Sequence, residues 1–282
     1  MRIVVLSDFT GTQLQAAEER HRALHAAQVA QHAAAVDRVC AANARRLAAP
    51  VVEWRAGRYG AALLAYARRL LTAPLPLPPA PPSPTRTREM NILETGQAGE
   101  QAVRSELAGI LDDGWTAITG YKNPRGEVDL ILVGPPGVLA LEVKAINGKV
   151  CVNGDSWWRD KYDRYGNLVE TQLPITDQAG RSPSRQLNEP VDMLQTQLAR
   201  RSVWVPVHRG VVLAHHASQL GDVSNPTVQF VGLISDLRRY VLAQHMTRPG
   251  HGSPLVQRVV EIVCADHQFH AKRYHARAAR AG

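Results

Sequence analysis

The sequence has no long apolar run. None of its 282 residues lies in a stretch that approaches the roughly 18 consecutive apolar residues of a membrane-spanning helix. The apolar part of its opening, "MRIVVLSDF", is too short for the core of a signal peptide. Its three cysteines, Cys40, Cys151 and Cys264, lie far apart without C-x-x-C spacing, which argues against a disulfide framework or a zinc knuckle. We therefore predict a cytoplasmic protein with reduced cysteines and no membrane partner.

Negative charge is also in short supply. The chain has 33 Lys and Arg against 25 Asp and Glu, a net charge of +8 and a sequence pI near 9.7. Such an excess favours an anionic partner such as nucleic acid, although charge alone does not identify it. An apolar content of 45% is ordinary for a soluble protein, and the length allows one substantial core plus a smaller element.

Glycine and proline are absent from residues 12–48, which are rich in alanine and predict one long helix. Apolar residues recur there only loosely at helical spacing, which indicates a narrow packing face. We expect a helical N-terminal module over residues 1–72, with a shorter helix at 53–71 packing back on the first. Such a module has the potential to bind a protein partner or to self-associate. The prolines of "APLPLPPAPPSPT" then predict an extended linker over residues 73–90, with a proline-motif ligand as the alternative.

From Asn91 onward the pattern alternates between helix and strand. We expect helices at 94–114, 184–201 and 235–245, strands at 128–133, 138–144, 149–153, 205–214 and 227–234, and a last apolar segment at 254–265. This order predicts an α/β domain over residues 91–265, a mixed β-sheet with helices on its faces. Residues 266–282 form a basic C-terminal tail, which either follows a phosphate backbone or frays in solvent.

The stretch "GEVDLILVGPPGVLALEVK", residues 126–144, places charges inside a predicted β-hairpin. With "GPPG" as the loop, Val133 pairs with Val138 and Asp129 lies opposite Glu142. Directly opposed residues share one face of a sheet, and like charges there are destabilising. The two-residue period of a strand places Lys144 on the same face as Glu142, whereas the alternate residues 139, 141 and 143 form an apolar surface.

Two interpretations fit this hairpin. In the first, Lys144 neutralises one carboxylate in an ordinary ion pair, which leaves the other carboxylate without a partner. In the second, Mg²⁺ or Mn²⁺ binds the carboxylate oxygens, because hard divalent cations prefer such ligands and keep several waters. Lys144 would then orient or deprotonate a water and offset charge on a phosphoryl oxygen. The second interpretation predicts a nuclease-type site.

Three segments in order, "GQAGEQAVRSEL", "GEVDLILVGPPGVLALEVKAINGKV" and "SPSRQLNEPVDMLQTQL", resemble the motifs of the nuclease-related domain, NERD. NERD belongs to the restriction-endonuclease-like PD-(D/E)xK superfamily, and the resemblance covers about residues 92–240. It implies an αβββαβ core and metal-dependent phosphodiester cleavage. The site residues that it implies are Asp129 and Glu142 as metal ligands, the Val143 carbonyl as a third, Glu100 as a direct or water-mediated ligand, Lys144 as the catalytic lysine, and Gln186 as a residue that positions the lysine or the phosphate.

The sequence departs from the family pattern at two positions. Leu130 follows the motif aspartate where many relatives resemble "DH", so a polar substrate contact is missing. Pro190 stands four residues after Gln186, where related nucleases often have tyrosine. Because proline removes a helical hydrogen bond, we expect the helix to be kinked or to begin after Gln186.

Aromatic and basic residues are crowded in "DSWWRDKYDRYGN", residues 155–167. Such residues can stack on bases and hold phosphates. The candidate nucleic-acid-binding residues are Trp157, Trp158, Arg159, Lys161 and Arg164. The alternative is a hairpin whose tryptophans cap the core, and both hold if one tryptophan points inward and the other outward.

The sequence thus predicts a divalent-metal-dependent nuclease that acts on DNA in preference to RNA. One alternative is a non-catalytic nucleic-acid-binding or scaffold protein that keeps the same fold. Another places the function in the N-terminal helices, as part of a multiprotein DNA-processing or defence system. Retention of all three hairpin charges favours the enzyme, because opposed carboxylates cost stability.

Overall fold

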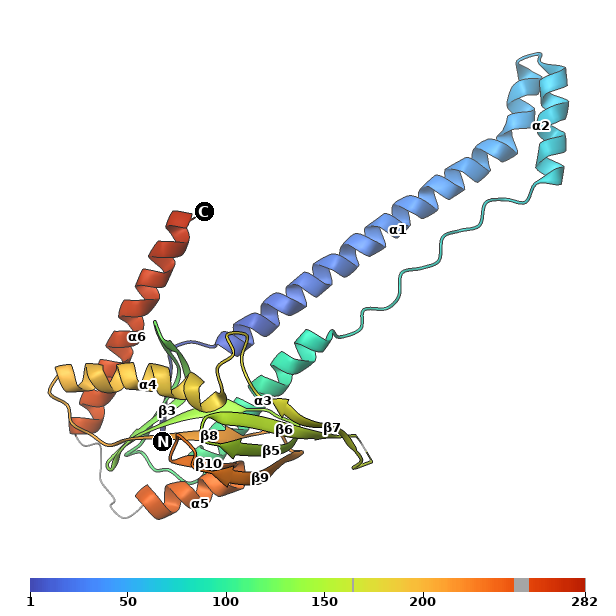
Figure 1. The fold of residues 1–282 in the computed structure, drawn as a ribbon. Coiled ribbons are helices and arrows are strands. Elements are labelled where there is room, and N and C mark those ends of the chain that lie inside the picture. The colour runs from blue at the N-terminus through green and yellow to red at the C-terminus, as the bar shows by residue number, and fades with distance from the viewer. Residues whose placement is uncertain (164, 246–253, 282) are drawn as a thin grey trace. The chain divides into compact units, whose positions relative to one another are not determined.

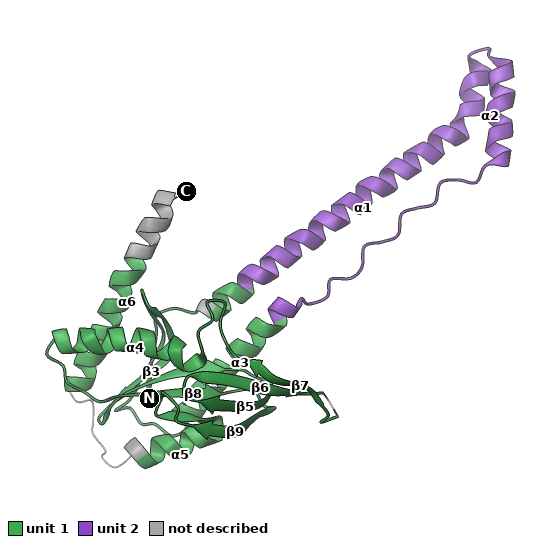
Figure 2. Ribbon diagram, in the orientation of Figure 1, with its two compact units in different colours: residues 1–14, 91–282 green, residues 15–90 purple. Residues whose placement is uncertain are grey.

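The computed structural model describes residues 1–163, 165–245 and 254–281. The chain divides into two compact units, one of residues 1–14 and 91–282 and the other of residues 15–90 (Figure 2). Candidate residue Arg164 lies outside the described residues. The two units are described separately below.

Figure 1 shows the helices and strands of the described residues. The helices are α1 (Phe9–Arg55), α2 (Tyr59–Leu71), α3 (Arg88–Ala108), α4 (Pro183–Arg200), α5 (Ile234–His245) and α6 (Pro254–Ala281). The strands are β1 (Arg2–Val5), β2 (Thr116–Asn123), β3 (Gly126–Gly134), β4 (Gly137–Lys144), β5 (Gly148–Asn153), β6 (Ser156–Tyr162), β7 (Leu168–Pro174), β8 (Val207–Leu213), β9 (Ser218–Ser224) and β10 (Phe230–Leu233). Helix α2 and most of α1 belong to the smaller unit, whereas the described strands belong to the larger one. Among the described helices, none has both the length and the apolar character that crossing a bilayer requires.

A six-stranded mixed sheet in the order β1-β2-β3-β4-β8-β10 forms the centre of the larger unit. Strands β2, β3 and β4 are antiparallel neighbours, whereas β1, β8 and β10 each join by parallel pairing. Alternate residues of β3 serve two cores. Ile131 packs with α4 and α6 on one face, and Leu132 packs with α3 and α5 on the other. The predicted α/β class, a mixed sheet flanked by helices and preceded by a helical segment, is confirmed.

The predicted αβββαβ order corresponds to α3-β2-β3-β4-α4-β8. The strand expected at 149–153 is β5, but it is not the third strand of this core. It pairs instead in a separate four-stranded sheet of order β7-β6-β5-β9, so β5, β6 and β7 are an insertion between β4 and α4. The true first strand of the core, β2, was not predicted. Its sequence, "TAITGYKN", carries a glycine and polar residues instead of an apolar alternation, although nearly all of it is buried.

Strand β1 adds the N-terminus to the edge of this sheet. Ile3 pairs with Ala117 in parallel register, and the amide of Leu6 donates to the carbonyl of Thr119 at 3.0 Å. The chain then passes over Gly120, whose φ is +68° and where an added Cβ would lie 2.1 Å from the carbonyl oxygen of Ser7. Glycine is therefore required there for the N-terminal segment to cross β2. The sequence interpretation assigned residues 2–5 no role in the sheet.

A buried polar network attaches helix α6 to the sheet. The Tyr121 hydroxyl donates to Asp266 at 2.6 Å, and the Gln197 amide donates to the other oxygen of Asp266 at 3.0 Å. The backbone amide of Lys122 donates to Nδ1 of His267 at 3.1 Å. Asp266 and His267 are buried, so the first residues of the segment expected to be a basic tail belong to a packed helix.

In the smaller unit, the proline-rich segment lies along α1. The side chain of Asn43 donates to the carbonyl of Leu75 at 3.0 Å and accepts from its amide at 2.9 Å. Arg46 donates to the carbonyls of Thr72 and Ala73, at the end of α2. Helix α1 begins three residues before the expected start, at Phe9, and runs through Pro50 to Arg55. These contacts hold the expected linker against the helix that precedes it.

Candidate active site

The β3–β4 hairpin has the register that the sequence predicts. Val133 pairs with Val138, Gly134 with Gly137, and Leu130 with Leu141, which is the last pair of the ladder. Beyond that pair, Oδ2 of Asp129 accepts a hydrogen bond from the backbone amide of Val143 at 2.7 Å. Asp129 and Glu142 both line one cavity at this end of the hairpin. The ladder ends one pair before Asp129 and Glu142, and both carboxylates line the same cavity.

Lys144 lies between a carboxylate and an amide. Its Nζ is 2.6 Å from Oε1 of Glu142 and donates to Oε1 of Gln186 at 2.8 Å. The amide nitrogen of Gln186 donates in turn to the carbonyl of Arg181 at 2.8 Å, which fixes the orientation of the glutamine. The structure thus brings Gln186 to the lysine, the contact that a lysine-positioning residue requires.

Helix α4 presents Gln186 from its first turn. Ser182 caps the helix by accepting a hydrogen bond from the amide of Arg185, and Pro183 follows the cap. The expectation that the helix could begin after Gln186 is wrong, because the cap and the first turn form upstream of it. Pro190 is buried inside the helix, and its carbonyl accepts from Asn123 at 2.9 Å.

Helix α3 and the N-terminal segment also contribute to the lining of the cavity. Oγ1 of Thr10 donates to Oε1 of Glu100 at 2.9 Å. Oγ of Ser7 donates to the carbonyl of Gly120 at 2.7 Å and lies 3.4 Å from Oε1 of Glu127. Glu100 therefore lies at the same cavity as Asp129 and Glu142. The cavity has a volume of about 190 Å³, and its lining residues are Ser7, Thr10, Glu100, Gly120, Glu127, Asp129, Glu142, Arg181 and Gln186.

Sequence reasoning missed four of these side chains. Glu127 was recoverable, because it lies two residues before Asp129 and the period of a strand places both on one face. Ser7, Thr10 and Arg181 carried no such signal, since they reach the cavity from segments far away in the sequence. Tertiary structure alone brings them there.

Burial raises the pKa of every carboxyl group in the cavity. It raises the pKa of Asp129 to about 6 and that of Glu142 to about 7, with Lys144 opposing the shift in both. The pKa values of Glu100 and Glu127 are also raised, first by burial and then by neighbouring carboxylates. Burial disfavours the Lys144 ammonium, but Glu142 and Asp129 outweigh it and keep the lysine pKa above its usual value. The cavity therefore concentrates negative charge that it neutralises only in part.

Comparison with known protein families identifies this region. A family model described as "Nuclease-related domain", NERD, matches residues 95–214, which include α3 from its second turn onward, the β3–β4 hairpin and α4. Residues 95–214 are a nuclease-related domain. Searches of curated proteins and of solved structures each gave no match. The domain belongs to the restriction-endonuclease-like superfamily, in agreement with the resemblance seen in the sequence.

The nuclease-related domain does not complete the cavity by itself. Ser7 and Thr10 lie outside the matched residues, yet each donates a hydrogen bond within the cavity lining described above. Strand β1 and the first turn of α1 therefore form part of the same structural unit as the nuclease-related domain, although they are separated from it in sequence.

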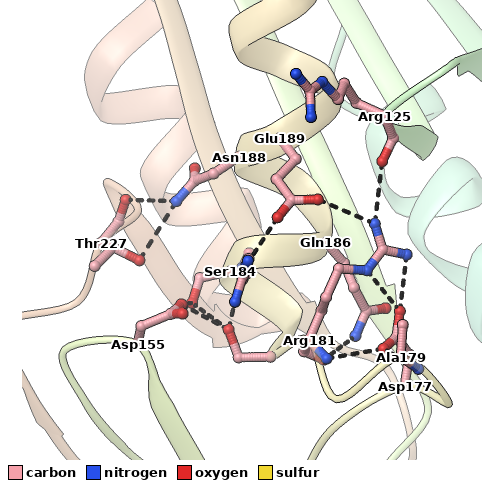
Figure 3. Close-up of polar contacts among 12 residues, drawn as sticks. Arg125, Asp155, Asp177, Ala179, Arg181, Ser184, Gln186, Asn188, Glu189 and Thr227 are labelled. Carbon is pink, nitrogen blue, oxygen red and sulfur yellow. Dashed lines mark hydrogen bonds and ion pairs between the residues drawn. The ribbon is translucent and has the colours of Figure 1, made fainter.

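Arg181 provides a fixed cation at the cavity of the nuclease-related domain (Figure 3). Its Nε donates to Oδ2 of Asp177 at 2.9 Å, and its Nη1 donates to the carbonyl of Arg125 at 3.0 Å. The same Nη1 lies 3.3 Å from a carboxylate oxygen of Glu189. With these partners the guanidinium is held in place, and its charge opposes the rise in the pKa of Glu142 that burial causes.

The two tryptophans of the insertion differ in exposure, as in the alternative with one ring inward and the other outward. Trp157 is buried in the core and donates from Nε1 to Oγ of Ser184 at 2.8 Å, so its ring is not exposed for base stacking. Trp158 is partly exposed. Arg159 donates to the carbonyl of Asn147 at 3.1 Å, and Lys161 lies 3.5 Å from Glu170. Trp158, Arg159 and Lys161 remain candidates for contact with nucleic acid.

The donor chemistry of the cavity fits a divalent cation. Carboxylate oxygens from Asp129 and Glu142 are hard ligands, and Glu100 adds a third carboxylate to the cavity lining. Their raised pKa values also fit, because a bound cation would relieve the repulsion between them. Within the described part of the chain, however, no three His, Cys, Asp or Glu side chains gather closely enough to hold a metal ion. Glu142, one of the carboxylates that would bind the cation, is instead paired with Lys144 in this arrangement.

Proposed function

We propose that this protein is a divalent-metal-dependent nuclease that hydrolyses phosphodiester bonds, with DNA as the preferred substrate. The observation that carries this proposal is that Asp129, Glu142 and Gln186 line one cavity of a nuclease-related domain, with Lys144 in contact with both Glu142 and Gln186. Buried opposed carboxylates reduce stability, so their presence is explained best by a cation that uses them. The basic net charge supports a polyanionic substrate.

Asp129 and Glu142 would hold Mg²⁺ or Mn²⁺, with the Val143 carbonyl and Glu100 as further ligands. The bound ion would supply an acidified water and a positive charge for the phosphoryl oxygens. Asp129 is already oriented by the hydrogen bond from the Val143 amide. Gln186 would keep Lys144 at the cavity when Glu142 turns to another partner, because its own amide is anchored on the Arg181 carbonyl.

The protonation state of Lys144 defines its role. Its pKa is raised by the neighbouring carboxylates, so near neutral pH the side chain holds its proton at Nζ. A protonated lysine donates hydrogen bonds and cannot accept a proton from water. Lys144 would therefore orient the attacking water or stabilise charge on a phosphoryl oxygen, and it would not act as the general base in this state.

Cleavage assays test the proposal directly. Supercoiled plasmid, linear duplex, single-stranded DNA and RNA are incubated with wild type, Asp129→Ala or Glu142→Ala in Mg²⁺, Mn²⁺ or EDTA. The matched control is Glu170→Ala, which removes an exposed carboxylate of β7. We expect metal-dependent cleavage of DNA by wild type and the control, and a loss of at least about 100-fold in both cavity variants. Full activity of Asp129→Ala would refute the assignment.

A second candidate function is a non-cutting nucleic-acid-binding platform. The observation that favours it is the 2.6 Å ion pair between Lys144 and Glu142, together with the lack of a metal-binding trio among the residues described. A platform predicts salt-dependent DNA binding that persists in EDTA and in Glu142→Ala, without product. The same assays, supplemented by a binding measurement, separate the two functions.

A further inference from the structure

Helix α2 in the smaller unit has its apolar face turned outward. Ala62 is buried at 4% exposure, whereas Leu63, Leu70 and Leu71 are 67%, 68% and 84% exposed. A helix that packs on a neighbour normally buries its large apolar residues and exposes its small or polar ones. Here the small residue faces inward and the leucines face solvent, so the exposed face is available for a different partner.

The exposed residues form a continuous face. Leu63 and Leu70 are seven residues apart, as are Leu64 and Leu71, and so are Tyr59 and Tyr66. A spacing of seven returns to nearly the same side of a helix, which aligns these three pairs along α2. All six side chains are more than half exposed. Large exposed apolar faces on a soluble protein mark sites of interaction.

The end of α1 lies beside α2 across the turn between the two helices (Figure 1), and it also exposes apolar side chains. Val51, Val52 and Trp54 are each more than half exposed. The rings of Trp54 and Tyr59 meet edge to face, with centroids 4.9 Å apart, across this turn. We call residues 45–71 the helical tip.

The charge of the helical tip is almost entirely positive. Its sequence has six arginines, one glutamate and no aspartate, lysine or histidine. The single carboxylate, Glu53, is paired with Arg58 at 3.1 Å. Arg68 and Arg69 are exposed at the end of α2 and follow the leucine face. An occupant of this surface must therefore accept both apolar side chains and arginines.

We propose that the helical tip binds the surface of an anionic lipid bilayer. Leucines and aromatic rings enter the interface between headgroups and acyl chains, and flanking arginines attract anionic headgroups. A second copy of the chain fits less well, because it would bring arginines against arginines. Nucleic acid would engage the arginines, but it gains nothing from exposed leucines. This proposal is independent of the nuclease function, and it departs from the sequence-based expectation of no membrane partner, which rested on the absence of a spanning segment.

Vesicle sedimentation of the full chain tests this proposal. The probes are phosphatidylcholine vesicles with and without phosphatidylglycerol. The first variant combines Leu63→Glu and Leu70→Glu, and the second combines Arg68→Gln and Arg69→Gln. The matched control combines Leu168→Glu and Val169→Glu, which places the same two charges on exposed apolar residues of β7. Circular dichroism confirms that each variant keeps its helices.

We expect wild type and control to bind the anionic vesicles, and each tip variant to bind at least about tenfold more weakly. Neutral vesicles should bind wild type less than anionic ones, and high salt should weaken the anionic binding. The absence of sedimentation by wild type would overturn the proposal, as would equal binding by the leucine variant. A wild-type dimer that the leucine variant converts to a monomer, without vesicle binding, would instead identify a second copy as the occupant. Duplex DNA binding that the arginine variant alone loses, again without vesicle binding, would identify nucleic acid.

Discussion

At the scale of single residues, Asp129 should reduce the stability of the protein as the pH rises. Burial raises its folded-state pKa from 3.8 to about 6, so between these values the native state binds more protons than the unfolded chain. Stability from this group therefore falls as the pH rises through that window. Asp129→Asn should raise the free energy of unfolding by about 1–3 kcal/mol above about pH 7 and by little near pH 4.

Urea unfolding in EDTA at several pH values measures this difference. The contrasting variant is Asp177→Asn. Partial burial opposes ionisation of Asp177, but hydrogen bonds from Arg181 outweigh it and lower the pKa. Loss of that carboxylate should cost stability at high pH, the opposite sign. A pH-independent effect of Asp129→Asn would show that burial does not raise the pKa of the Asp129 carboxyl group.

Lys144 gives a second prediction at this scale. Lys144→Met removes the cation that lowers the pKa values of both Asp129 and Glu142. Under the proposed function, cleavage should fall by about 100-fold to 1,000-fold, and the rising limb of the pH–rate profile should shift to higher pH. Lys149→Met, at a partly exposed lysine of β5 outside the candidate site, is the matched control and should change neither quantity. A normal pH profile in Lys144→Met would contradict the electrostatic role.

The positions of the charged residues in the hairpin could be predicted from the sequence because they depend only on local features. Strand period and a four-residue loop place Asp129 opposite Glu142 without any knowledge of the rest of the chain, and the observed register follows them. Thr10 and Arg181 could not be found this way. Thr10 contacts Glu100 across 90 residues of sequence, and only the packing of the first turn of α1 against α3 brings the two together.

At the scale of elements, close packing of α3 explains why residue 99, in the first segment that resembles the nuclease-related domain, is glycine. A Cβ at Gly99 would lie 3.1 Å from Cβ of Ala214 and 3.5 Å from Cβ of Ala145, so α3 approaches the ends of β4 and β8 closely. Gly99→Ala should therefore destabilise the protein by about 1–3 kcal/mol.

The matched variant is Gly96→Ala, one turn earlier in the same helix. The nearest atom to an added Cβ there is Cγ2 of Thr10 at 3.7 Å, an ordinary contact. Alanine should be tolerated and should stabilise α3 by up to about 1 kcal/mol through its helix propensity. Thermal or urea unfolding of both variants measures the contrast, and equal effects would exclude close packing as the reason for Gly99.

The start of α1 gives a prediction about the coupling of elements. Thr10 lowers the pKa of Glu100 through its hydrogen bond, against the stronger effect of burial. Thr10→Val should raise that pKa further and shift the acid limb of the cleavage profile upward, whereas Thr10→Ser should preserve it. Thr12→Val is the control, because the Thr12 hydroxyl donates only to the carbonyl of Asp8 at the exposed surface. Equal profiles for Thr10→Val and Thr12→Val would exclude this coupling.

Element boundaries show where local patterns fail. Strands with nearly continuous apolar runs, such as β3 and β4, were found nearly to the residue. Strands β1 and β2 were missed, because β1 is short and β2 is buried on both faces while carrying glycine and polar residues. The division of the strands into two sheets was also beyond reach, since strand pairing depends on partners distant in sequence, such as β5 with β9.

At the scale of the whole molecule, the larger unit should fold without residues 16–89, which we call the helical arm. It contains every strand, and its two segments approach each other where Thr10 lies beside Gly96. Replacement of residues 16–89 by a short glycine-serine loop should therefore leave a cooperative unfolding transition and an intact cavity, because Ser7, Thr10 and Glu100 are all retained.

Cleavage and vesicle binding by this deletion variant then separate the two proposed activities. If the arm only binds a lipid surface, the variant should keep its cleavage rate on naked DNA and lose sedimentation with anionic vesicles.

Loss of cleavage in a variant that unfolds cooperatively would instead mean that α1 beyond its first turn holds Thr10 in place. The helix begins at Phe9 and carries the cavity hydroxyl of Thr10 in its first turn, so truncation could release that turn and free Glu100. A further variant that restores residues 16–30 alone separates two causes. Recovered cleavage would mean that the first turn of α1 needs a longer helix to stay in place, and continued loss would mean that cleavage needs the helical tip.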